Sequence, residues 1–413
     1  MAKNNSNPQV RFAGYTEDWE ERDLGEILTE RKVLQKISED APILAFAAGQ
    51  GVIDRSERKS NNRDHLTLDQ ENKIYKLTEL SDIVYNPSNL KYGAIDRNKH
   101  GRGVISPIYV TFTTEEEPSF LELIVKSEKF KLRALQYEEG TVVKRQSVKP
   151  ENLLSLKVNI SPSKEEQKQI GNLFENLEQL INLHQNKYNK LVVIKKAMLE
   201  KMFPKKGEVN PQVRFNSFNI SWEQNRLDEL SEVYDGTHQT PSYTENGIMF
   251  LSVENIKNLT SKKFISIKDF EKDFNNFPEK GDVLMTRIGD IGTTNVLETN
   301  EQVAYYVSLA LFKHIKLDPY FLKECIESET VKKDLWHRTL HIAFPKKINK
   351  NEIEKVIIPY PESNIEQEKI GVFFKQLNSL INLHQIELDK LNKIKKACFE
   401  KMTNATFQKR VKQ

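Results

Sequence analysis

The chain repeats itself, and this duplication limits its fold more than any other feature of the sequence. Residues 170–202 and 370–402 are offset by 200 positions, agree at 19 of 33 positions and share the unbroken run Leu-Ile-Asn-Leu-His-Gln. Residues 7–27 and 210–230 also agree, since both begin with Asn-Pro-Gln-Val-Arg-Phe and contain a Trp-Glu pair. Two copies are too few for a solenoid, which stacks three or more short units. The sequence therefore predicts two similar domains related by a pseudo-two-fold axis.

Each domain is expected to be mixed α/β, because the segments between the constant parts combine strand-like and helical patterns. Helical patterns cover residues 120–130 and 321–335, and each begins just after a proline, Pro118 or Pro319, a residue that suits the first turn of a helix. Four runs are rich in the β-branched and aromatic residues that favour strands: 83–85, 103–112, 282–285 and 305–312.

Both copies of the 33-residue repeat predict a long helix. Apolar side chains recur at three- and four-residue steps, and a seven-residue repeat that starts at position 170 continues through four heptads, with the second copy in phase. A helix of 33 residues runs about 50 Å. The residues expected to pair the two helices are Ile170, Leu177, His184, Leu191, Ile370, Leu377, His384 and Leu391.

The predicted fold class is α+β, with two mixed α/β domains joined by two long antiparallel helices in a coiled coil. His184 and His384 occupy equivalent positions in the otherwise apolar seam. They could form a metal-binding or catalytic pair, or they could be polar residues that fix the register, hydrogen-bonded across the seam. The expected division of the chain is 1–160 (first domain), 161–205 (first helix), 206–360 (second domain) and 361–413 (second helix).

Composition excludes several classes of protein. Two cysteines in 413 residues are too few for a disulfide scaffold or a cysteine-rich zinc site. The N-terminus lacks the apolar region of a secretory signal, and no run approaches the roughly 18 apolar residues of a membrane span, so a cytoplasmic protein is expected. The net charge is only +3, from 62 basic and 59 acidic residues. Such a small net charge is not typical of nucleic-acid-binding proteins, which are usually strongly basic. However, the net charge does not show where on the surface the charges lie.

Basic residues gather at matching places in the two halves. Residues 127–149 and 330–350 are both rich in lysine and arginine, and the second stretch has six basic residues against one acidic residue, Asp334. Loops 54–63 and 91–102 add more, with Tyr92 among them. Such clusters are often only solvated surfaces, but their recurrence favours contacts with DNA phosphates and bases.

Motifs for catalysis are scarce. The sequence has neither the Gly-x-Gly-x-x-Gly pattern of dinucleotide sites nor a P-loop. Asp318-Pro-Tyr-Phe321 resembles a motif of amino-methyltransferases, but it lacks one proline, and its counterpart Glu117-Pro-Ser-Phe120 departs further. A proline at the start of a helix explains both tetrapeptides. No catalytic residue, cofactor site or metal site is predicted.

Taken together, the duplicated helices, the Arg-Phe and Trp-Glu openings and Tyr234-Asp-Gly-Thr-His-Gln-Thr-Pro241 resemble the specificity subunits of type I restriction–modification systems. The resemblance covers nearly the whole chain. It implies a non-enzymatic subunit with two target-recognition domains, each of which reads one half of a split double-stranded DNA sequence. The helices would set the spacer and dock two modification (methyltransferase) subunits, joined by restriction subunits that translocate DNA. S-adenosylmethionine and ATP with magnesium are expected on those partners, with no cofactor on this chain.

Under this resemblance, DNA-contacting residues can be nominated in both domains. Arg287 is a candidate base reader, because it follows a predicted strand and precedes a Gly-Asp-Ile-Gly turn. The first domain lacks the Asp-Gly-Thr-His opening, which implies a different half-site. The full set of candidates is Lys91, Tyr92, Arg97, His100, Arg102, Lys144, Arg145, Thr237, His238, Thr240, Arg287, Lys346 and Lys347.

Two other functions compete with this interpretation. A single-chain enzyme with its own methyltransferase or nuclease site would need a cofactor motif that the sequence does not supply. A non-DNA scaffold would use the coiled coil to present two domains that recruit proteins. DNA binding that weakens as salt rises would separate the DNA-binding subunit from the scaffold.

Overall fold

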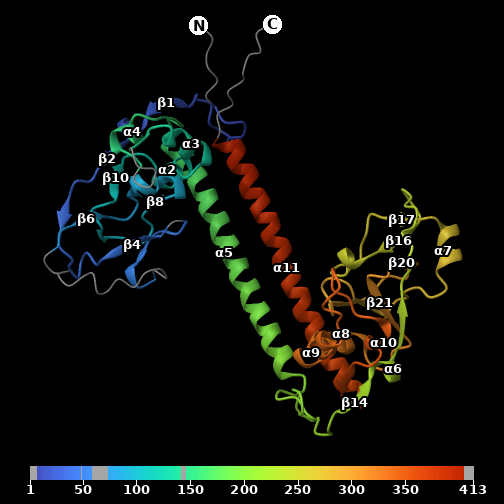
Figure 1. The fold of residues 1–413 in the computed structure, drawn as a ribbon. Helices are drawn as coiled ribbons and strands as arrows, with labels where there is room; N and C mark the ends of the chain where they lie inside the picture. Colours follow the sequence, from blue (N-terminus) through green and yellow to red (C-terminus); the bar gives the residue numbers. More distant parts are fainter. Residues whose placement is uncertain (1–6, 48, 58–72, 141–145, 404–413) are drawn as a thin grey trace, which may run out of the picture. The chain divides into compact units, whose positions relative to one another are not determined.

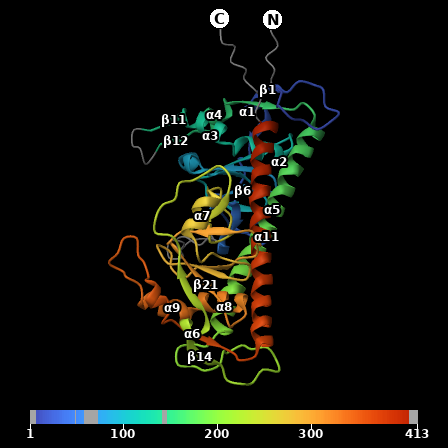
Figure 2. The same cartoon turned by 90° about the vertical axis from the view of Figure 1, so that its right-hand side faces the viewer.

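The computed structural model describes residues 7–47, 49–57, 73–140 and 146–403 (Figures 1 and 2). The chain divides into two compact units. The first unit contains residues 1–183 and 388–413, and the second contains residues 184–387. Each long helix therefore contributes one part to each unit.

The first unit is built around a four-stranded antiparallel sheet with the order β2-β10-β7-β8. These strands are β2 (Leu28–Glu30), β10 (Val110–Thr114), β7 (Ile83–Tyr85) and β8 (Ile95–Arg97). A three-stranded sheet and a two-stranded ladder complete this part of the unit. They consist of β3 (Leu34–Gln35), β6 (Tyr75–Thr78), β9 (Gly103–Ile105), β4 (Leu44–Ala47) and β5 (Gly51–Asp54).

The second unit repeats this plan, with a four-stranded sheet in the equivalent order β15-β21-β18-β19. These strands are β15 (Glu232–Asp235), β21 (Leu309–Lys313), β18 (Val283–Thr286) and β19 (Thr294–Val296). A second sheet has the order β17-β16-β20 and contains the parallel pair β16 and β20. Its strands are β17 (Phe264–Ile265), β16 (Ile248–Leu251) and β20 (Val303–Tyr305). The two variable segments therefore share the four-stranded sheet despite their different sequences, while their smaller sheets differ.

Each predicted domain helix is in fact a pair of helices. The first unit has α2 (Pro118–Val125) and α3 (Glu128–Leu135), and the second has α8 (Pro319–Glu327) and α9 (Glu329–His337). The prolines occupy the first turns of α2 and α8, as predicted. Ser127 has an extended backbone, and its side chain accepts a hydrogen bond from the backbone N–H of Phe130, which ends one helix and starts the next.

Two predicted strands are also divided. The run 103–112 forms β9 and β10, and the run 305–312 forms the end of β20 and most of β21. A turn separates the members of each pair, since Tyr109 N–H donates to the Ser106 carbonyl and Leu309 N–H donates to the Tyr306 carbonyl. The apolar residues on both sides of Ser106-Pro107 and of Ser308 concealed the two turns.

The two long helices are α5 (Lys164–Lys201) and α11 (Asn364–Met402). In the first unit, Phe174 packs edge-on against Phe399, and Glu178 pairs with Lys395. Residue numbers therefore rise along α5 where they fall along α11. In the second unit, His184 meets His384, while Phe203, just beyond the end of α5, packs against Phe374. The helices are therefore antiparallel within each unit, which confirms the predicted α+β class with paired long helices.

Each unit has its own main hydrophobic core, and both cores use the constant residues in the same way. Trp19, Ile170 and Phe174 join Met402 in the first core. Trp222, Ile370 and Phe374 join Met202 in the second. Each core thus contains the start of one long helix and the end of the other, which explains why these segments are nearly constant between the two copies. Among the residues described, no helix is long and apolar enough to cross a membrane.

Candidate nucleic-acid interface

The constant segments clamp each long helix to its unit. Arg11 makes a bidentate ion pair with the fully buried carboxylate of Glu166 on α5, with distances of 2.7 Å from Nε and 2.8 Å from Nη2. Arg214 holds Glu366 on α11 in the same way, at 2.6 and 2.8 Å. Burial raises the pKa of Glu166, but hydrogen bonds from Arg11 and Ser161 outweigh it and leave that pKa below its usual value.

The same segments also bind the ends of the opposite helices. Val10 N–H donates to the Lys401 carbonyl of α11 at 3.1 Å, and Val213 N–H donates to the Lys201 carbonyl of α5 at 2.8 Å. In each unit, the Asn-Pro-Gln-Val-Arg-Phe segment therefore links the end of one long helix to the start of the other. These contacts explain why the same six residues occur in both halves of the chain.

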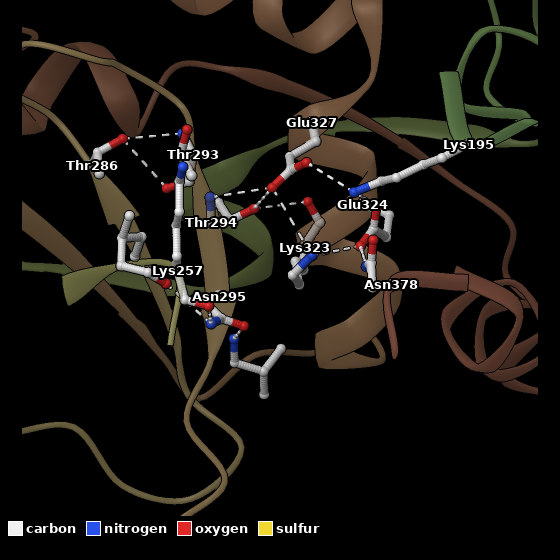
Figure 3. Close-up of polar contacts among 12 residues, drawn as sticks. Lys195, Lys257, Thr286, Thr293, Thr294, Asn295, Lys323, Glu324, Glu327 and Asn378 are labelled. Carbon is white, nitrogen blue, oxygen red and sulfur yellow. Dashed lines mark hydrogen bonds and ion pairs between the residues drawn. The ribbon is translucent and has the colours of Figure 1, made fainter. Parts of the chain in front are cut away.

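A network of charges joins the second unit's domain to both helices (Figure 3). Lys195 of α5 places its Nζ 3.5 Å from a carboxylate oxygen of Glu324 and of Glu327, both on α8. Asn378 of α11 donates to Glu324 at 2.8 Å, and the Thr294 hydroxyl of β19 contacts Glu327 at 3.3 Å. Burial raises the pKa of Glu327, but the neighbouring Lys323 and Lys195 bring it below its usual value. Lys195 therefore stabilises the joint between helix and domain.

The first unit has a corresponding joint that uses Arg97. The Arg97 guanidinium is largely buried and pairs with Glu122 of α2, at 3.0 Å, and with Glu175 of α5. Lys99 contacts Glu122 and Glu178, and Lys395 of α11 reaches Glu178 at 2.9 Å. Arg97 was nominated as a DNA contact, but its charge is already satisfied between the domain and α5, so it takes no part in the interface proposed below.

In the second unit, several nominated residues gather at one end of the four-stranded sheet. β15 and β18 end there, and β21 begins there, because Asp235 lies opposite Ala310 and Thr286 lies opposite Leu309. The loop that carries Thr237, His238 and Thr240 leaves β15 at this end, and its backbone is held through Thr237 N–H to the Tyr305 carbonyl, at 3.2 Å. His238 and Thr240 are exposed, and Thr237 is half-buried.

Arg287 lies at the same end but faces inward. Its residue is only 6% exposed, and its guanidinium pairs with Asp235 and donates from Nε to the Ile348 carbonyl at 3.1 Å. A buried and satisfied guanidinium cannot reach a base edge without breaking these contacts. The nomination of Arg287 as a reader is therefore replaced by a role in positioning the loop beside it.

A basic hairpin, residues 340–347, stands beside this end of the sheet. Leu340 N–H donates to the Lys347 carbonyl at 2.8 Å, which closes the hairpin, and Gly289 N–H donates to the Lys346 carbonyl at 2.8 Å, which fixes it to the loop after β18. Lys346 and Lys347 are exposed, and the Lys346 Nζ lies 4.3 Å from the centre of the Trp336 ring. Two nominated lysines thus lie on a hairpin that is fixed to the loop after β18, at the sheet end where the loop of Thr237 also begins.

The first unit places Lys91 and Tyr92 at the equivalent sheet end. They close the short 3₁₀ helix Pro87–Tyr92 that follows β7, as residues 287–292 follow β18. Tyr92 is 68% exposed, and Lys91 lies 3.8 Å from Glu138. A ladder of β11 (Glu138–Glu139) and β12 (Ser147–Val148) takes the place of the second unit's hairpin base. The nominated Lys144 and Arg145, between these strands, lie outside the described residues.

His100 and Arg102 are separated from this group. They follow β8, whose last residue Arg97 pairs with Ile83 at the opposite end of the same sheet. Both are exposed, and Arg102 pairs with Glu79. The nominated residues of the first domain therefore do not form one surface.

The seam histidines meet each other. The Nδ1 atoms of His184 and His384 lie 3.1 Å apart, within hydrogen-bond distance, so one ring must present a protonated nitrogen and the other a lone pair. Burial and the neighbouring His184 lower the pKa of His384, which favours the neutral form of His384. Ile170, Leu177, Ile370 and Leu377 are buried, while Leu191 and Leu391 are half-buried.

Among the described residues, no group of three or more His, Cys, Asp or Glu side chains could hold a metal ion. The Asp318 carboxylate accepts a hydrogen bond from Phe321 N–H at 2.8 Å and so caps α8, as the helix-start explanation of the Asp-Pro motif requires.

Comparison with known proteins agrees with this architecture. Residues 219–395 match the family model of the type I restriction modification DNA specificity domain. The MjaVIII type I restriction enzyme specificity subunit of Methanocaldococcus jannaschii is 26% identical over 254 residues. Residues 219–395 therefore belong to the type I restriction modification DNA specificity domain family. Members of this family are non-catalytic, in line with the prediction that the chain is not an enzyme.

The relatives differ in how much of the chain they cover. The match to the MjaVIII subunit spans 57% of this chain and 58% of the relative, less than two thirds of its length. A crystal structure of an S subunit from M. genitalium has the same fold, with a TM-score of 0.59 and 16% identity over 97% of this chain and 100% of that chain. The HsdS subunit from Thermoanaerobacter tengcongensis gives a TM-score of 0.41, at 17% identity over 93% and 96% of the two chains.

Proposed function

We propose that this specificity subunit recognises a bipartite double-stranded DNA target, with one half read by each unit. The observation that carries the proposal is the repeated placement of polar and basic side chains at the same sheet end in both units. Tyr92 and Lys91 lie there in the first unit, and His238, Thr240 and Lys347 lie there in the second. Different residues at equivalent places are what two different half-sites require.

The long helices would set the distance between the half-sites. A helix of 38 or 39 residues runs about 57 Å at 1.5 Å per residue. That length suits half-sites about one to two DNA turns apart, since one turn is about 34 Å. In this division the domains 1–160 and 206–360 would read DNA, while residues 161–205 and 361–413 would form the spacer.

The helices also offer matched surfaces for two copies of one partner. Leu180 and Leu183 of the first unit and Leu380 and Leu383 of the second are between 44% and 50% exposed, and they come from the identical hexapeptide. Exposed leucines repeated at equivalent places favour a helix-packing partner. We assign these surfaces to two modification subunits, which would carry S-adenosylmethionine, with ATP and magnesium on the restriction subunits. Such an assembly would act on chromosomal DNA in the cytoplasm.

Selection of DNA by the assembled modification complex tests this function. The complex is incubated with random duplexes, and bound sequences are recovered at low and high salt. Two specified blocks separated by an unspecified spacer, with affinity that falls as salt rises, would support bipartite recognition. Binding without sequence preference, or binding insensitive to salt, would favour the protein-recruiting scaffold instead.

A further inference from the structure

The hairpin of the second unit ends in an apolar tip. Ile342 is 99% exposed and Phe344 is 103% exposed, although both belong to residue types that folded proteins usually bury. The hairpin base is fixed by Leu340 to Lys347 and by Ile288 to Lys347, so the tip is presented by an anchored loop. Figure 2 shows this segment in orange, leaving α9 at the edge of its unit.

The surroundings of the tip are cationic. Residues 338–350 contain four lysines and arginines and no aspartate or glutamate. Within the described part of the chain, neither Lys346 nor Lys347 has a carboxylate within ion-pair distance. Trp336, which is 52% exposed, contacts two residues of the hairpin: the Lys346 Nζ lies over its ring, and the His341 ring packs against it at 4.3 Å between ring centres, tilted by 57°. A partner that suits this tip must accept an aromatic side chain and also carry dense negative charge.

Stacked bases between two phosphate backbones meet both requirements. We propose that Phe344, supported by Ile342, inserts between adjacent base pairs of the second half-site while Lys346 and Lys347 bind the flanking phosphates. This inference rests on the proposed function and adds a residue-level role to it. Apolar wedges unstack a base step and bend the duplex, at a cost of a few kcal/mol per step that further protein contacts offset. Flexible pyrimidine–purine steps would be preferred at that position.

The wedge is tested with the full chain in its modification complex, on a duplex that carries the target found by the selection above. The fluorescent base 2-aminopurine, whose fluorescence rises when it is unstacked, replaces one purine at a time, excluding the bases that the complex methylates. Wild type is compared with Phe344→Ala, Phe344→Leu and the matched control Ile220→Ala, which removes another exposed apolar side chain (66% exposed) of the same unit.

With wild type, Phe344→Leu and Ile220→Ala, we expect 2-aminopurine fluorescence to rise at one base step of the second half-site, referred to as the bright step. With Phe344→Ala, we expect this rise to be lost. Specific affinity should fall about 10- to 100-fold in Phe344→Ala, since a buried Phe side chain is removed from the complex. Thermal stability should not change, because the side chain touches solvent only.

Other outcomes overturn the wedge. Specific binding by wild type without any bright step, or a bright step that survives Phe344→Ala, would refute it and leave DNA recognition intact. Weaker assembly of the complex by Phe344→Ala with unchanged DNA binding would assign the tip to a protein partner. Absence of specific binding by wild type would refute the proposed function itself.

Discussion

The ion pairs Arg11–Glu166 and Arg214–Glu366 occupy equivalent positions in the two units, so their contributions to stability can be compared within one chain. Arg11 and Arg214 are each 13% exposed, and each forms a bidentate pair with a carboxylate that is 0% exposed. The carboxylates differ in their other partners. Glu166 also accepts hydrogen bonds from Trp19 Nε1, at 3.1 Å, and from Ser161. Glu366 lacks both, because Pro361 replaces the serine and the Trp222 Nε1 is buried without a partner in the described part of the chain.

Replacing each arginine by methionine should therefore have unequal effects. Arg214→Met leaves Glu366 buried without the donor that neutralises it, which costs about 3–5 kcal/mol. Arg11→Met leaves Glu166 with two donors, and hydrogen bonds to charged groups contribute about 1.5–3 kcal/mol each. We expect Arg11→Met to cost at least about 1.5 kcal/mol less than Arg214→Met.

Urea unfolding followed by tryptophan fluorescence and circular dichroism measures both costs, because Trp19 reports on the first core and Trp222 on the second. The double variant Arg214→Met/Glu366→Leu is the control, since removing the stranded charge should recover most of the lost stability. Equal costs for the two methionine variants, or no recovery in the double variant, would refute the reasoning.

Three further predictions concern charge and length. Because the pKa of Glu166 is lowered in the folded chain, its contribution to stability is present above the unfolded pKa and is lost as pH falls through the folded pKa. The difference in urea midpoint between wild type and Glu166→Gln should therefore shrink from pH 7 towards pH 3, and a constant difference would contradict the assignment. Lys346→Ala and Lys347→Ala should each lower the salt slope of DNA binding by about 1 without changing sequence preference, whereas Arg287→Ala should lower the urea midpoint. One heptad inserted into both long helices at the same level keeps the seam in phase and adds about 10 Å, so the preferred spacer should grow by about three base pairs, as DNA selection would reveal.

Local sequence patterns were sufficient to predict the duplication, the long helices and the fold class of the domains. A seven-residue apolar repeat specifies a helix and its packing face without reference to the rest of the chain. Turns inside continuous apolar or helical runs were missed, as at Ser127, where one capping side chain divides a helix. Serine at such a position is the signal that could have revealed the break.

Charge counts could not separate DNA contacts from internal ion pairs. Arg97 and Arg287 looked like free cations because their partners, Glu175 and Asp235, are distant in the sequence. The apolar tip at Phe344 was missed for the opposite reason, since an isolated Phe is usually interpreted as a core residue. The folded structure distinguishes the buried arginines from the exposed Phe344. The exposure of a side chain depends on contacts between segments that are far apart in the sequence, and local patterns do not predict those contacts.

Bipartite DNA recognition can be tested directly by mapping adenine methylation in a host that produces the modification subunits, with and without this chain. The account predicts one methylated motif, with two specified blocks separated by an unspecified spacer, that is present with the chain and absent without it. An identical set of methylated sites in the two hosts would contradict the account.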